Sequence, residues 1–170
     1  MELSKQNGSS MRVWMNKEHT ASPTVGLGSL MTTCVIDAKE NRDVATIDIP
    51  NAFIQTDLTG ETVIMKIKGE LVGILLEIDP NAYKDYIVYE NNVPVLYLEV
   101  LKALHGMLHS SLLFYRKFVK DLKSYGFELN PYDPCIANKM VNNKQLTICW
   151  HVDDLKALHE ESEAIDEFVK

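Results

Sequence analysis

The chain has 170 residues, of which 46% are hydrophobic and 24% are charged. That length fits one domain with a core of its own, and the composition is that of a folded globule rather than a disordered chain. The formal charge of -7, from 17 basic and 24 acidic side chains, argues against a simple nucleic-acid-binding domain, whose affinity depends on neutralising phosphates. The charge is uneven, however, because basic residues crowd the middle of the chain and acidic residues crowd its end.

Other features of the sequence exclude several settings. The first ten residues have no basic start followed by an apolar stretch, so no secretory signal is predicted, and no apolar run is long enough to cross a bilayer. Cys34, Cys135 and Cys149 show no paired short spacing, which predicts neither a disulfide framework nor a zinc ribbon. We therefore expect an intracellular, cytoplasmic protein without a membrane partner, with residues 1–20 as a poorly defined extension and residues 21–170 as one unit.

The first predicted element in chain order is a short helix over residues 29–41, whose core-facing positions by helical spacing are Leu30, Cys34, Val35 and Ala38. Further on, residues 62–67 and 95–100 are predicted as strands. The segment 69–78 between them fits either a helix or a buried strand.

Residues 43–50, DVATIDIP, alternate as a strand. One face carries Val44, Thr46 and Asp48, and the other carries Ala45, Ile47 and Ile49. Pro50 lacks a donor for the strand ladder and ends the element. Asp48 is therefore expected at the carboxyl end of a strand.

Residues 110–127 form the clearest helical pattern. Its predicted core positions are Leu112, Tyr115, Val119 and Leu122, with Ser110 as the N-terminal cap and Gly126 closing the end. Arg116, Lys120 and Lys123 fall on the outer face, as either a solvated stripe or a contact for a phosphate backbone.

A hairpin is predicted near the end of the chain. Asn142 and Asn143 tolerate positive φ and separate two strand-like runs, 135–140 and 144–152. By the period of two, Thr147, Cys149, His151 and Asp153 should share a face of the second run.

Asp153 and Asp154 are adjacent carboxylates directly after that apolar strand. An isolated Asp-Asp pair is most often a solvated turn. If Asp48 lies beside the pair in a sheet, however, three acidic groups converge and require cations. Mg²⁺ prefers such oxygen ligands, and two ions about 3.5–4 Å apart can activate a 3′-oxygen and stabilise a leaving pyrophosphate.

Four blocks of the sequence occur in the order found in reverse transcriptases of copia-type LTR retrotransposons, which the chain resembles from about residue 22 to its end. They are ATIDIPNAFIQTDLTGETVIMKI, VLYLEVLKALHGML, YGFELNPYDPCIANKM and WHVDDLK. The resemblance implies an RNA-directed DNA polymerase that uses two Mg²⁺ ions, with Mn²⁺ as an alternative. Asp48 and Asp153 match the family's metal ligands, and Asp154 completes the acidic cluster.

The resemblance also implies a substrate site. Phe53 matches the family's steric gate against a ribose 2′-OH, although a plain core phenylalanine is the competing interpretation. The backbone amides around Asn51 and Ala52 match the segment that faces the triphosphate of the incoming nucleotide. The implied partners are deoxynucleoside triphosphates and an RNA or DNA template with its primer, in the cytoplasm, a virus-like particle or the nucleus.

The chain departs from the family pattern at several positions. The four residues 151–154, HVDD, begin with His151 where the family usually has Tyr. The segment HGMLHSSLLFY replaces the usual YGLKQA-R-W segment, with Leu108, His109 and Leu112 at the positions of Lys, Gln and Arg. His105 and His109 lie one helical turn apart, as zinc ligands often do, but no Glu follows His105 as in the metalloprotease motif.

The sequence as a whole predicts an α+β fold, with a polymerase palm-type antiparallel sheet, packed helices and the fingers and palm of a reverse transcriptase, the thumb being absent. The predicted function is that of a retrotransposon polymerase domain, from a truncated copy. A catalytically inactive remnant that keeps the palm fold as an interaction module is the first alternative. A template-independent, Mg²⁺-dependent phosphoryl transferase is the second.

Overall fold

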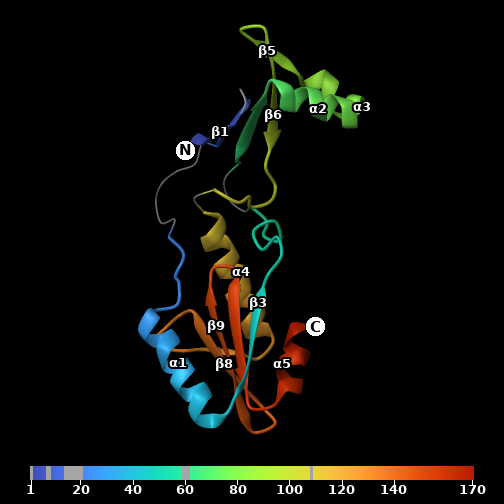
Figure 1. Ribbon diagram of the computed structural model, residues 1–170. Helices are drawn as coiled ribbons and strands as arrows, with labels where there is room; N and C mark the ends of the chain where they lie inside the picture. The colour runs from blue at the N-terminus through green and yellow to red at the C-terminus, as the bar shows by residue number, and fades with distance from the viewer. Residues whose placement is uncertain (1, 7–8, 14–20, 59–61, 108) are drawn as a thin grey trace.

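The computed structural model describes residues 2–6, 9–13, 21–58, 62–107 and 109–170. These residues form an α+β fold with two antiparallel five-stranded sheets, in the orders β1-β2-β4-β6-β5 and β3-β10-β9-β8-β7. Figure 1 shows the first sheet at the top of the molecule and the second below it. The predicted class, an α+β protein with antiparallel sheets, is confirmed.

The first sheet is built from two parts of the chain, residues 2–13 and residues 64–99. Its strands are β1 (Glu2–Gln6), β2 (Ser9–Val13), β4 (Ile64–Lys68), β5 (Val88–Glu90) and β6 (Val93–Glu99). The helices α2 (Glu70–Ile78) and α3 (Pro80–Tyr83) and a 3-10 turn (Lys84–Tyr86) connect β4 to β5. The segment 69–78 therefore forms a helix. The described parts of the predicted 1–20 extension pair with β4 through β2, and no strand was predicted there.

The second sheet carries the larger core. Its strands are β3 (Asp43–Asp48), β7 (Glu128–Leu129), β8 (Ile136–Val141), β9 (Lys144–His151) and β10 (Asp154–His159). Its helices are α1 (Leu27–Glu40), α4 (Ser110–Ser124) and α5 (Ser162–Val169). Helices α4 and α5 pack on one face of this sheet, and α1 contacts the other.

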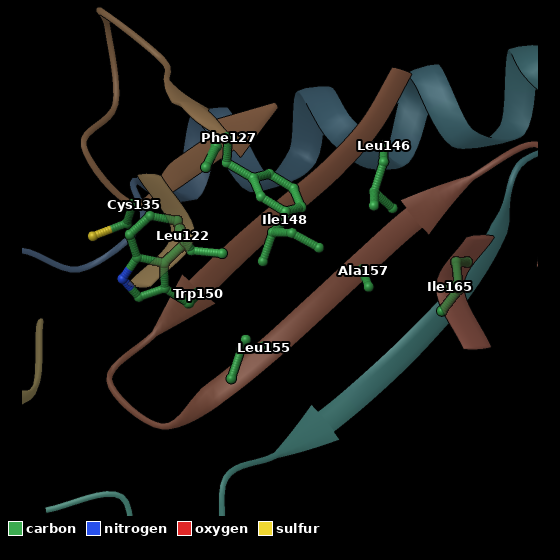
Figure 2. Close-up of a cluster of buried hydrophobic side chains, with 10 residues drawn as sticks. Leu122, Phe127, Cys135, Leu146, Ile148, Trp150, Leu155, Ala157 and Ile165 are labelled. Carbon is green, nitrogen blue, oxygen red and sulfur yellow. The ribbon is translucent and has the colours of Figure 1, made fainter. Parts of the chain in front are cut away.

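The core under α4 and α5 follows from strand alternation. Every second residue of β9 points into it, namely Leu146, Ile148 and Trp150, together with Leu155 and Ala157 of β10 (Figure 2). The predicted apolar face of β3 packs against the same cluster through Ala45, Ile47 and Ile49, as the alternation of that strand requires. The opposite face of β3, which ends in Asp48, is exposed.

The predicted core face of α1 is wrong except at Leu30, which is half-buried. Val35 is 68% exposed and Cys34 and Ala38 are also exposed, whereas Thr33 and Asp37 are buried. The physical reason is an ion pair between Asp37 and Lys156 of β10, which turns a polar side of the helix toward the sheet.

The ends of α4 and the hairpin give a mixed result. Ser110 is not the cap; it is the first helical residue, and its Oγ donates to the Leu104 carbonyl at 2.6 Å. Gly126 does end the helix, with φ of 83°, and Asn142 and Asn143 have the predicted positive φ, 50° and 62°. Arg116, Lys120 and Lys123 are exposed.

Within the described residues, no helix is both long and apolar enough to span a membrane.

Candidate functional site

Two aspartates face each other at one end of the second sheet. Asp48 is the last residue of β3, Asp154 is the first of β10, and the antiparallel register pairs them directly. Residues paired in this way point to the same face, with Cα atoms about 4.5–5.5 Å apart. Just beyond the ladder, the Ile49 N–H donates to the Asp153 carbonyl at 3.2 Å. Folding therefore brings Asp48 beside Asp153 and Asp154, the two adjacent aspartates that are called the doublet below.

A strained turn presents the doublet. Val152 and Asp153 alone join β9 to β10, and Val152 has φ of 60°. A β-branched residue in this region is a backbone outlier, and such strain persists where the surrounding structure enforces it. The predicted face of Thr147, Cys149, His151 and Asp153 is corrected here, since β9 ends at His151 and Asp153 lies in the turn. Asp154, rather than Asp153, occupies the strand position opposite Asp48.

The strand pairing orders the polar residues on this face in rows. His151, Asp154 and Asp48 form one row across β9, β10 and β3. Cys149, Lys156 and Thr46 form the next row. An open cavity of about 470 Å³ lies over both rows and is also lined by Val25 and Leu30 from the chain around the start of α1. Asp48 and Asp154, here called the acid pair, are exposed and lie at the edge of this open cavity.

Lys156 is the fixed positive charge in this cavity. Its Nζ donates to Asp37 Oδ2 at 2.6 Å and lies 3.3 Å from both Thr33 Oγ1 and Cys34 Sγ. Burial by itself would lower the pKa of Lys156. The hydrogen bonds to Asp37 and Cys34 outweigh that effect, so the pKa is raised above its usual value. The lysine is therefore a charged ammonium at neutral pH.

The acidic residues fit a magnesium ion that the substrate helps to hold. Mg²⁺ is usually bound by one or two carboxylates together with substrate phosphates and waters. Asp48 and Asp154 offer two facing carboxylates, with Asp153 in the adjoining turn. Among the described residues, no three His, Cys, Asp or Glu side chains converge enough to enclose a metal ion.

The predicted substrate residues follow β3 in a turn-rich segment. Asn51 has φ of 55°, and Ala52 is buried. The ring of Phe53 is half-buried, 5.5 Å from that of His105 and 6.2 Å from that of Phe114 between centroids. None of Asn51, Ala52 and Phe53 lines the cavity over the acid pair. The structure therefore places these residues next to Asp48 in the chain but not inside that cavity.

Two residues of this region, Asp37 and Lys156, were not predicted from the sequence. Lys156 could have been noticed, because it is two residues after Asp154 and so on the same strand face. Asp37 carried no such signal, since its partner lies 119 residues away in the chain. Of the two histidines with zinc-like spacing, His105 has its ring tilted by 51° against that of Phe53, and the Nε2 atom of His109 is buried. Leu108 lies outside the described residues.

Comparison of the chain with models of known protein families, with curated proteins and with solved structures gives no match in any of the three.

Proposed function

We propose that the chain is the fingers and palm of an RNA-directed DNA polymerase of the copia retrotransposon type, transferring nucleotides from dNTPs to a primer 3′-OH. The observation that carries the proposal is the direct pairing of Asp48 with Asp154 beside Asp153. Two like charges directly opposite each other destabilise a sheet. An arrangement of this kind is expected where cations are part of the function.

The residues of the chain have distinct roles in this proposal. Asp48, Asp153 and Asp154 would hold two Mg²⁺ ions, or Mn²⁺, together with the phosphates of the substrate. When bound, such ions activate the attacking 3′-oxygen and stabilise the leaving pyrophosphate. The backbone around Asn51 and Ala52 orients the triphosphate, and Phe53 excludes the ribose 2′-OH by contact. The template with its primer is the second substrate.

Primer extension on an RNA template with Mg²⁺ and dNTPs tests the proposal. The wild-type chain should extend the primer, and Asp48→Asn and Asp153→Asn should each abolish extension. Asp43→Asn is the matched control, since Asp43 begins the same strand as Asp48 and is exposed at its other end. Extension that survives Asp153→Asn would defeat the metal assignment.

The inactive-remnant alternative is favoured by one observation. His105 stands at the position where the usual YGLKQA-R-W segment of the family begins with Tyr. A remnant would fold and yet extend no primer under any metal condition. Nucleotide turnover without a template would instead support the second alternative, a different Mg²⁺-dependent phosphoryl transferase.

A further inference from the structure

Lys156 lies beside the acid pair but is turned away from it. It is two residues from Asp154 on the same face of β10, and it pairs with Thr46 in the row next to Asp48. It is the one lysine or arginine among the described residues that line the cavity over the pair. Its ammonium nevertheless contacts α1 and not the aspartates.

Asp37 fixes that orientation. The Asp37 and Lys156 side chains are 9% and 16% exposed, and their 2.6 Å contact is supplemented by Thr33. Asp37 and Thr33 also line a separate cavity of about 400 Å³ between α1 and the sheet. The ion pair therefore stands between two hollows, and the ammonium is held on the α1 side of its own cavity.

The lysine can reach the aspartates if this contact is lost. Residues two apart on a strand are separated by about 6.6–6.8 Å, which is close to the span of an extended lysine side chain. Two facing carboxylates attract any cation within reach. An ammonium and a divalent metal ion would then compete for the same oxygens.

We propose that Asp37 is a positioning residue that holds the Lys156 ammonium off the Asp48–Asp154 pair and thereby keeps the pair open for a divalent cation. This inference rests on the proposed function, because it assumes that the pair binds metal. The Asp37–Lys156 contact comes from α1, outside the acidic cluster, and would regulate the access of a metal ion to that cluster. Loss of Asp37 would convert Lys156 into an internal competitor of the metal.

A double-mutant cycle on metal binding tests the proposal without any need for activity. Mn²⁺ alone is titrated into the full chain, and free Mn²⁺ is followed by electron paramagnetic resonance. Asp37→Asn should weaken Mn²⁺ binding by about three- to tenfold, and Lys156→Met should strengthen it by about threefold. In the Lys156→Met background, Asp37→Asn should change the affinity by less than about twofold.

Two controls separate positioning from other effects. Asp43→Asn removes the same charge from the far end of β3 and should leave Mn²⁺ affinity within about twofold of wild type. Thr33→Val removes the weaker contact to Lys156 and is the milder variant if Asp37→Asn does not fold. It should also weaken binding in the wild-type background and not in the Lys156→Met background.

The outcomes distinguish the two proposals. If wild type binds Mn²⁺ through Asp48 but Asp37→Asn has an equal effect in both backgrounds, the positioning proposal is overturned and the metal site stands. If wild type shows no Mn²⁺ binding that Asp48→Asn removes, the metal site falls and the positioning role falls with it.

Discussion

Removing one charge of the acid pair should stabilise the protein when no divalent cation is present. Asp48 and Asp154 are directly opposite and both exposed. Two carboxylates about 5–6 Å apart in a water-like dielectric repel by roughly 1 kcal/mol at low ionic strength, and cross-strand like charges are generally worth about 0.2–1 kcal/mol. Asp48→Asn should therefore raise the free energy of unfolding by about 0.5–1 kcal/mol in EDTA.

Urea unfolding followed by tryptophan fluorescence measures this effect, because Trp150 is 1% exposed in the core beneath the pair. Wild type, Asp48→Asn, Asp154→Asn and the double variant form the cycle. The second substitution should add less than about 0.3 kcal/mol, and 1 M NaCl should remove most of the gain, since the Debye length then falls to about 3 Å. In excess MgCl₂ the order should reverse, with wild type the most stable. A gain of the same size in the Asp154→Asn background would refute the pairing.

Three further predictions concern the surroundings of the site. Val152→Gly should stabilise the protein by about 1 kcal/mol in urea unfolding, because glycine relieves the positive φ of the turn, and a loss of stability would show that the turn is not strained. Asp133 is 5% exposed and accepts N–H bonds from Gly26 at 2.9 Å and Cys135 at 3.0 Å. Burial alone would raise its pKa, but these bonds and one from Ser29 lower it overall. Because the folded pKa lies below the unfolded value of about 4, the stabilisation is complete above that value and is lost as the pH falls through the folded pKa. Asp133→Asn should thus lower stability by about 1–3 kcal/mol at pH 7 and flatten its loss in acid, and an unchanged pH profile would contradict this. Phe53→Ala should raise ribonucleotide relative to deoxyribonucleotide incorporation in primer extension, and unchanged discrimination would argue against the gate.

The elements that local patterns specify were predictable from the sequence. The alternation of β3 placed Asp48 on the exposed face, and the left-handed preference of Asn142 and Asn143 located the hairpin. Gly126 marked the end of α4 for the same conformational reason. These features depend on residues that are neighbours in the chain, so a single sequence contains the information needed to find them.

Contacts between distant residues decided the features that the sequence did not reveal. The apolar spacing predicted the wrong buried face for α1, because the Asp37–Lys156 ion pair turns a polar side of the helix toward the sheet. The register of the β9–β10 turn, which puts Asp154 rather than Asp153 opposite Asp48, depends on where the ladder ends. The strand alternation around Asp48 could be predicted from the sequence. That β3 and β10 are neighbours in the sheet could be learned only from the structure.

The most direct test is anomalous diffraction from crystals of the chain grown with Mn²⁺, a primer–template and a dNTP. An anomalous peak is expected where β3 ends and β10 begins, with carboxylate oxygens of Asp48, Asp153 and Asp154 at roughly 2.0–2.2 Å from the metal, close to the distances seen for Mg²⁺. A peak elsewhere, or Asp48 and Asp154 separated on different faces of the sheet, would contradict it.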